Sequence, residues 1–206
     1  MSKIYRLIIF LSFLILGCAP NVIEENKVIQ KIDSLDMNIF SEEGDKIYSI
    51  SSPNSSYDII ELKFESNKPI INIFNGEETK YIISAEESTL SDNNKLLKLK
   101  GNVKLKNFKK DKGTLYADNF IWNIEETKYV LEGNIRFENE NIILNSEKAK
   151  LGLDNIIEFF NPVRYIIKDE NNENKYEITS ENAYYNLNTE SVSFKAKDKR
   201  VKSIIY

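Results

Sequence analysis

The chain has 206 residues but contains no histidine and only one cysteine, Cys18. The lack of histidine removes the commonest general base and the commonest metal ligand. The sequence also has no G-x-x-x-x-G-K-[ST] phosphate loop, no G-x-G-x-x-G segment and no G-x-S-x-G nucleophile elbow. We therefore predict no catalytic residues, no metal site and no cofactor, and we expect the chain not to be an enzyme. A carboxylate pair or a Ser–Lys dyad assembled by folding stays open as an alternative, although no spacing suggests one.

An excess of basic residues is also missing. The chain carries 28 basic and 32 acidic residues. Residues 1–17 hold two basic residues and no acidic one, so the remainder has 26 against 32, a net charge of −6. This mildly acidic balance argues against a nucleic-acid partner.

The N-terminal apolar stretch is too short to be a good transmembrane helix. Leu7 to Leu16 is about ten residues long, whereas a helix needs roughly 20 to cross a bilayer. Basic Lys3 and Arg6 precede it, and Leu14-Ile15-Leu16-Gly17-Cys18 ends it as a lipobox. We predict a lipoprotein signal peptide over 1–17 and lipidation of Cys18, which leaves no thiol for a disulfide. An uncleaved N-terminal anchor is the alternative.

A short pattern recurs along the rest of the chain: an aliphatic residue, any residue, a small residue, then usually an acid. Its copies are Ile83–Glu86, Leu115–Asp118, Leu144–Glu147 and Ile178–Glu181, with a weaker one at Ile50–Pro53. Successive copies lie 33, 32, 29 and 34 residues apart. A repeat of this length indicates one supersecondary unit used several times.

A second pattern follows three of these copies at a nearly constant distance. It is Leu99-Lys100-Gly101-Asn102-Val103, then Leu131-Glu132-Gly133-Asn134-Ile135, with Asn161-Pro162 in place of Gly-Asn in the third. Its glycine, or the asparagine in its place, lies 16, 16 and 15 residues after the small residue. Polar turns are expected at 91–94, 124–127, 153–155 and 188–190. Proline cannot donate a ladder hydrogen bond, so an edge, bulge or bend is expected at Pro162.

The segments between the turns alternate between apolar and charged residues. Leu97, Leu99, Val103 and Leu105 share one face, and the lysines at 98, 100, 104 and 106 share the other. Such alternation places one face of a sheet inside and the other in water. We expect the small residues at 85, 101, 117 and 133 also to point to the apolar face, where they would make room for a close approach.

These patterns predict an all-β fold, an antiparallel rolled sheet or β-jellyroll built from hairpin units of about 30 residues. A parallel β-helix is the alternative, but the short polar turns favour antiparallel pairs. We predict a lipid-anchored linker over 18–45 and the domain over 46–206. The spacing of Val28, Ile29, Ile32 and Leu35 suggests one or two helical turns in that linker.

The recurring L-x-A-D and L-x-G-N-V segments, on an exported and anchored chain of this size, resemble the lipopolysaccharide-export family of OstA-like β-jellyrolls. Within it, the size and the single N-terminal anchor are most similar to the LptC component. The resemblance covers roughly residues 45–205. It departs from the well-known members at Cys18, because they keep an uncleaved transmembrane helix, and at Asn161-Pro162.

The resemblance implies a bridge of end-to-end jellyrolls along which lipopolysaccharide moves from the inner to the outer membrane. Its implied partners are lipopolysaccharide, an inner-membrane ABC transporter, and other jellyroll bridge proteins at the N-terminal and C-terminal edge strands. The implied location is the cell envelope, facing the periplasm and lipid-anchored to the inner rather than the outer membrane. A structural or adaptor lipoprotein with a closed β core and no lipid cargo is the alternative.

The residues themselves also predict an apolar groove, because an open rolled sheet with a greasy inner face can hold acyl chains. A closed core would have the same pattern, so both interpretations stand for each residue. The predicted lining residues are Leu97, Leu99, Val103, Leu105, Leu131, Ile135, Phe137, Phe159, Val163 and Phe194.

The C-terminal segment from Ser191 to Tyr206 alternates and then becomes basic. It is interpreted as a docking edge for an acidic partner strand, as an edge protected by lysines, or as a site attracted to lipid phosphates. Residues 46–64 are expected to form the opposite edge.

Overall fold

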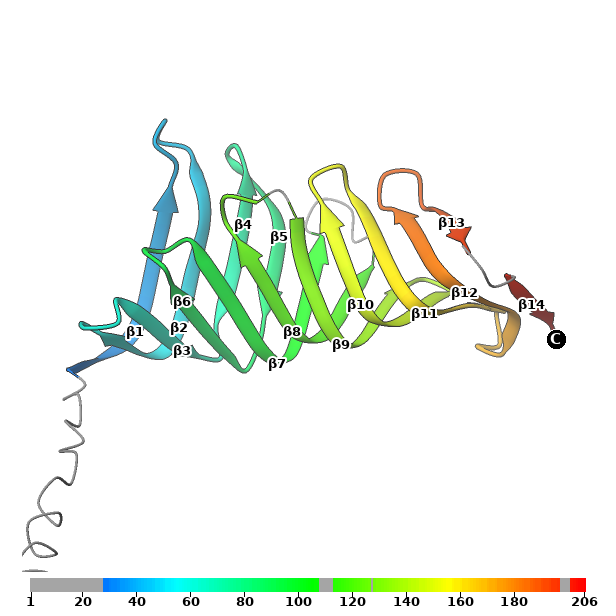
Figure 1. Cartoon of the computed structure of the whole chain (residues 1–206), viewed down its shortest axis with the longest axis horizontal. Helices are drawn as coiled ribbons and strands as arrows, with labels where there is room; N and C mark the ends of the chain where they lie inside the picture. The colour runs from blue at the N-terminus through cyan, green and yellow to red at the C-terminus, as the bar shows by residue number, and fades with distance from the viewer. Residues whose placement is uncertain (1–27, 108–112, 127, 197–200) are drawn as a thin grey trace, which may run out of the picture.

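A computed structural model describes residues 28–107, 113–126, 128–196 and 201–206 (Figure 1). The predicted signal peptide, Cys18 and the basic residues at 197, 199 and 200 lie outside these residues. The described part is a single rolled sheet of 14 strands in which every pairing is antiparallel. The all-β antiparallel prediction is therefore confirmed, and no pairing of the parallel β-helix kind occurs among these strands.

The strands follow one another closely along the chain. They are β1 (Ile29–Phe40), β2 (Lys46–Asp58), β3 (Lys63–Asn67), β4 (Ile70–Asn75), β5 (Glu78–Ser84), β6 (Glu87–Ser91), β7 (Leu96–Asn107), β8 (Thr114–Asn123), β9 (Lys128–Asn139), β10 (Ile142–Gly152), β11 (Ile156–Lys168), β12 (Asn174–Asn186), β13 (Ser191–Lys195) and β14 (Lys202–Ile205). The four predicted turns coincide with the connections that follow β6, β8, β10 and β12, except that Ser91 is the last residue of β6 and residue 127 lies outside the described residues. No helix in the part of the chain that the structure describes is long and apolar enough to cross a membrane.

Three long strands, β2, β7 and β12, change partners on one side halfway along their length. The first half of β7 pairs with β6 and its second half with β5, and β2 likewise pairs with β4 and then with β3. The sheet therefore folds into two walls that share the long strands. We call the wall with β4, β5 and β14 the first wall, and the wall with β3, β6 and β13 the second wall. In Figure 1 the strands bend along the lower edge, and hairpin loops lie along the upper edge.

The recurring sequence patterns lie where the strands bend from one wall to the other. The β7–β8 register shifts between Lys100 and Val103, and the β8–β9 register shifts between Tyr116 and Asn119. Gly101 and Gly133 have φ of 77° and 78°, and the asparagine after each has φ of 45° and 47°. Two successive left-handed residues are unfavourable for most side chains, which explains why Gly-Asn occupies these positions. Each bulge bends its strand at the corner.

The small residue and the acid of the first pattern form hydrogen bonds at the same bends. The Asn134 side chain donates a hydrogen bond of 2.7 Å to Asp118, and Asn102 donates one to Glu86. Where the small residue is serine, its hydroxyl bonds the backbone carbonyl two residues further on. Ser52, Ser146 and Ser180 do this at 2.8, 3.0 and 2.8 Å. The repeat thus encodes a row of bends.

The prediction that Gly101 and Gly133 make room on the apolar face is wrong. A Cβ on Gly133 would lie 2.5 Å from the Asp118 carboxylate, and one on Gly101 would overlap the Glu86 carboxylate. The acid on the neighbouring strand therefore occupies the space beside each glycine, so this space does not open toward the apolar face. The expectation at Pro162 is confirmed, because the registers of β11 with β10 and with β12 both shift there.

The prediction of a linker with helical turns is wrong for residues 29–40. They form β1, which pairs with β2 from Ile29 opposite Asp58 to Phe40 opposite Lys46. Ser34, with φ of 61°, falls at the corner and interrupts the alternation, which gives the first half a helical spacing. Because β1 covers β2, the N-terminal edge of the sheet is β1 rather than residues 46–64.

Candidate functional site

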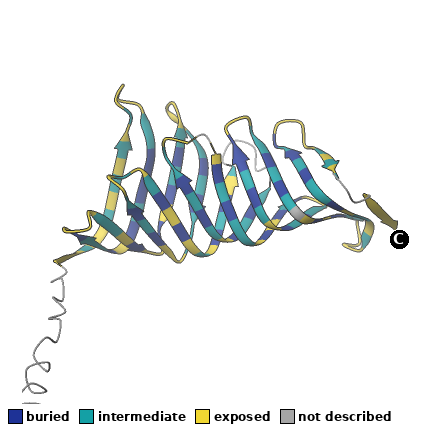
Figure 2. Cartoon of the chain, viewed as in Figure 1, coloured by how far each residue is buried: buried dark blue, intermediate teal, exposed yellow. Residues whose placement is uncertain are grey.

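The space between the two walls gathers the apolar side chains of the alternating strands. Nine of the ten predicted lining residues are at most 4% exposed, and Phe194 is partly buried against the same cluster. The cluster is continuous from β2 to β12. In Figure 2 the buried residues form bands across successive strands. The predicted residues are therefore brought together on one inner face.

Aromatic rings join one wall to the other along this space. Tyr48 on the first wall meets Trp122 on the second, with ring centroids 5.3 Å apart. Phe137 on the first wall lies 4.6 Å from Tyr185 on the second. Such tilted and edge-to-face pairs add about 0.5–1.5 kcal/mol each beyond their buried area.

Two further ring pairs extend this contact. Tyr81 lies 6.0 Å from Tyr129, and Tyr165 lies 5.4 Å from Phe194 near the C-terminal end. The sequence led us to expect an inner face that stays open along its length. Instead, the ring contacts join the two walls, and the inner side chains are almost fully buried.

Among the described residues, the apolar cluster contains no acidic or basic side chain. All members of the cluster are apolar or tyrosine, and Asp58 is the only buried charged residue among those the structure describes. Burial raises the pKa of Tyr129 to about 12 and also raises the pKa of Tyr48 and Tyr81, because the interior solvates a phenolate poorly. These tyrosines, already neutral at physiological pH, therefore stay neutral to a higher pH than an exposed tyrosine would.

The hydroxyls of three buried tyrosines, Tyr48, Tyr81 and Tyr185, join the walls at the upper edge. The Tyr48 hydroxyl donates to the carbonyl of Asn94 at 3.2 Å, and the Tyr81 hydroxyl donates to the Asn155 side chain at 3.1 Å. The Asn139 amide donates to the Tyr185 hydroxyl at 2.8 Å. Each bond joins the first wall to a strand or loop of the second. A molecule that enters between the walls from the upper edge must break these three hydrogen bonds.

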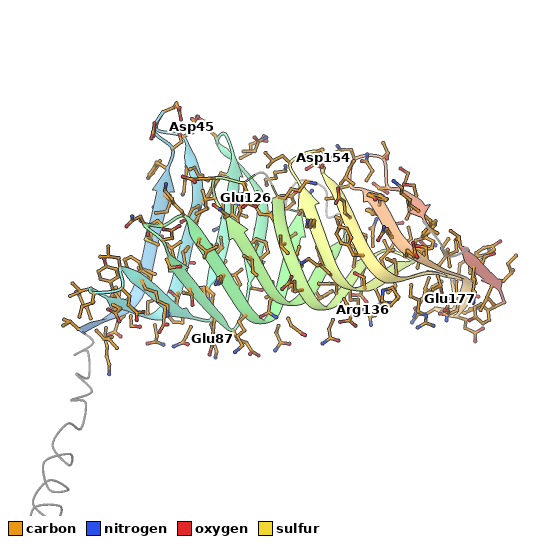
Figure 3. All side chains as sticks on the ribbon, viewed as in Figure 1. Asp45, Glu87, Glu126, Arg136, Asp154 and Glu177 are labelled. Carbon is orange, nitrogen blue, oxygen red and sulfur yellow. The ribbon has the colours of Figure 1, made fainter. Side chains whose placement is uncertain are left out.

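A lysine from the first wall reinforces this edge. The ammonium of Lys80 lies 3.3 Å from the carbonyl of Leu153, in the loop between β10 and β11. Burial lowers the pKa of Lys80, and the nearby Asp154 opposes that shift. Asp45 and Asp154, on loops of opposite walls, both lie along the upper edge in Figure 3.

The outer face is charged and solvated. The lysines at 98, 100 and 106 are exposed, as the alternation predicts. Cross-strand ion pairs join Lys148 to Glu132 at 2.6 Å and Arg164 to Glu177 at 2.7 Å. Within the described ranges, no group of three or more acidic, histidine or cysteine side chains is placed to hold a metal. The sheet therefore has an uncharged inner face and a charged outer face.

Four further aromatic residues of the interior, Tyr48, Tyr81, Trp122 and Tyr129, were not among the predicted lining residues, whereas Phe137, Phe159 and Phe194 were. Tyr81 precedes Ile83 by two residues, Tyr129 precedes Leu131 by two, and Trp122 follows the buried Phe120 by two. The same period-two alternation could have placed all three inside. It could not have shown which ring meets which, because partners such as Tyr48 and Trp122 lie 74 residues apart in the chain.

Comparisons with known proteins point to one family. The family model described as "Lipopolysaccharide-assembly, LptC-related" matches residues 7–155. No curated protein matches the chain. Among solved structures, the chain is similar to LptH of Pseudomonas aeruginosa, described as the LptA homologous periplasmic component of the lipopolysaccharide transport device. That match has 10% identity and a TM-score of 0.42, and covers 77% of this chain and 94% of the other.

Proposed function

Because the chain belongs to the LptC-related lipopolysaccharide-assembly family, we propose that it is a lipid-anchored component of the lipopolysaccharide transport bridge that holds acyl chains between its two walls. Members of this family are transport components of the cell envelope, not enzymes. The observation that carries the proposal is the uncharged apolar interior, which runs from β2 to β12 and is shared by both walls.

The acyl chains would take the place of the cross-wall ring contacts. Burial of hydrocarbon contributes about 25 cal/mol per Å² on each surface and has no directional requirement. A chain lying between the walls would therefore be held without a fixed register and could slide. Entry requires the walls to separate along the upper edge, where the hydrogen bonds of Tyr48, Tyr81 and Tyr185 close the space.

The anchor and the edges complete the proposal. Acylation of Cys18 after removal of residues 1–17 would tether the N-terminal end to the inner membrane, next to the ABC transporter that supplies the lipid. On the transporter side of the bridge, the edge strand β1 would pair with the neighbouring jellyroll domain. At the other end, β13 and β14 would accept a strand of the next bridge protein by β-augmentation.

A second function is supported by a specific observation. The inner side chains are almost fully covered, as in the core of a structural or adaptor lipoprotein. In that case the walls never separate, and no lipid enters between them.

Photo-crosslinking in cells separates the two functions. Benzoyl-phenylalanine at Phe137, which is 1% exposed, should capture lipopolysaccharide. The matched control is the adjacent Arg136 on the outer face, whose side chain is 51% exposed and lies near the lower edge in Figure 3. The partly buried Phe194 gives a second inner position at which the larger side chain is better tolerated. Absence of lipid adducts at both inner positions would favour the adaptor function.

A further inference from the structure

Exposed aliphatic side chains gather at the end of the molecule where the described chain begins. Among the described residues, most large exposed apolar side chains belong to two groups, one at this end and one at β14. We call the first group the apolar tip. Its members are Val28, Ile29, Ile59, Ile60 and Leu62, and each is between 47% and 56% exposed.

Hydrogen bonds hold the apolar tip in one shape. The Asp58 carboxylate accepts from the backbone amides of Ile60 and Glu61 at 2.9 and 3.0 Å. The amide of Ile59 donates to the carbonyl of Val28 at 3.1 Å, which fixes the turn between β2 and β3 against the start of β1. Leu62 has φ of 50°, a conformation that a bulky residue rarely adopts. The turn thus presents its aliphatic side chains to solvent in a fixed arrangement.

We propose that the apolar tip inserts into the headgroup region of the phospholipid bilayer that carries the lipid anchor. This inference rests on the anchor in the proposed function. Val28 follows Cys18 by ten residues, and an extended segment of that length spans at most about 35 Å. The tip therefore cannot lie far from the bilayer, because Val28 and Ile29 are the tip residues nearest in sequence to the anchored cysteine.

The chemistry of the tip suits a bilayer better than a protein strand. The amides of Ile59, Ile60 and Glu61 already have partners within the turn, so they are not available to a β-strand partner. The turn offers four exposed side chains to solvent, of which three are aliphatic and one is the Glu61 carboxylate. Aliphatic carbon is what an interfacial membrane contact buries, while a carboxylate stays at the water side of the headgroups. The exposed group at β14 differs, because it lies on a short strand at the end of the sheet.

Insertion of the tip would orient the whole molecule. The lipid anchor ties the chain to the bilayer at one point only, and a second contact at the tip would restrict rotation about that point. With the tip inserted as well as the anchor, β1 would face the membrane and β13 and β14 would point away from it. Figure 1 shows these strands at opposite ends of the sheet.

The test uses the full chain with its lipid anchor, reconstituted into vesicles of phosphatidylethanolamine and phosphatidylglycerol. Benzoyl-phenylalanine replaces Ile60, which is exposed, so folding is not at risk. The matched control carries it at Glu77, an exposed position in the turn between β4 and β5. We expect phospholipid adducts at Ile60 and none above background at Glu77.

Each other result contradicts the inference in a distinct way. The chain could float with the vesicles but give no phospholipid adduct at Ile60, or give equal adducts at Ile60 and Glu77. Either result would overturn insertion of the apolar tip and leave the lipid anchor standing. If the full chain failed to float with the vesicles, both the lipid anchoring and the insertion of the apolar tip would be overturned. In cells, a crosslink from Ile60 to protein in place of phospholipid would also overturn the tip, since it would identify a protein-binding surface.

Discussion

The interior around β9 and the interior at the C-terminal end follow the same alternating pattern, but they are packed differently. Around β9, Phe137 touches two rings of the opposite wall, and both Tyr81 and Trp122 contact Tyr129. At the C-terminal end the ring contact is the Tyr165–Phe194 pair, and β13 and β14 are only five and four residues long.

This difference teaches what alternation does and does not determine. Alternation places apolar side chains inside along the whole sheet, but rings long enough to reach the other wall decide where the walls meet. The C-terminal end keeps apolar side chains at its edge, with Ile205 73% and Tyr176 37% exposed. In the proposed function, this end passes lipid onward and so must be easier to open than the centre.

The largest expected effect is a loss of stability on truncation of a central ring. Phe137→Ala should lower the free energy of unfolding by about 3–5 kcal/mol, because it leaves a cavity between the walls. Phe194→Ala should cost only about 1 kcal/mol, since this ring is only partly buried and the end can relax. Urea denaturation of both variants checks the comparison, and equal losses would show that the centre and the end are packed alike.

The next effect concerns the corners. Gly133→Ala should cost about 2–3 kcal/mol, because alanine disfavours the left-handed conformation and its Cβ would displace Asp118 from Asn134. The matched control is Gly76→Ala, where φ is 63° and the added Cβ meets open space. That variant should lose about 1 kcal/mol from backbone strain alone. If thermal denaturation gives equal losses, the acid beside Gly133 has no part in the corner.

The smallest effect is the pH dependence of the C-terminal end. The Arg164 guanidinium bonds Glu177 at 2.8 and 2.7 Å and lowers the pKa of that carboxyl below its usual value near 4.5. A lowered folded-state pKa contributes stability above the unfolded value, and this is lost as pH falls through the folded one. Arg164→Met should therefore cost less than about 1 kcal/mol at pH 7.

The difference between wild type and Arg164→Met should begin to shrink as the pH falls below about 4.5 and should vanish below the lowered folded-state pKa of Glu177. Glu177→Gln serves as the control, because it removes the titrating group and should abolish the pH dependence of the difference. Denaturation curves between pH 3 and pH 7 measure both. A difference that stays constant over this range would mean that Arg164 acts through packing rather than through charge.

The fold could be predicted from the sequence largely because its information is local. The period-two alternation marks the strands, and the recurring small residue, acid and Gly-Asn mark the bends. The first strand was missed because Ser34 takes a left-handed conformation at the corner and shifts the spacing of Ile32 and Leu35 to three residues.

The candidate site could be predicted only in part, for a physical reason. Which residues face inward depends on neighbours two positions away, and Leu97 and Leu131 are buried as the alternation implies. Whether the inner face is open or filled depends on contacts between walls, such as Tyr48 with Trp122. Those contacts follow from the curvature of the sheet, to which every strand contributes.

The central claim is that acyl chains enter between the walls and displace the ring contacts. The chain has a single tryptophan, Trp122, which is 4% exposed and touches both Tyr48 and Tyr129. Its fluorescence therefore reports on the interior directly. We predict strong quenching by lipopolysaccharide that carries a nitroxide on an acyl chain, and none by the same label on deacylated sugar. Lipid binding that leaves Trp122 fluorescence unchanged with the acyl-chain label would contradict the account.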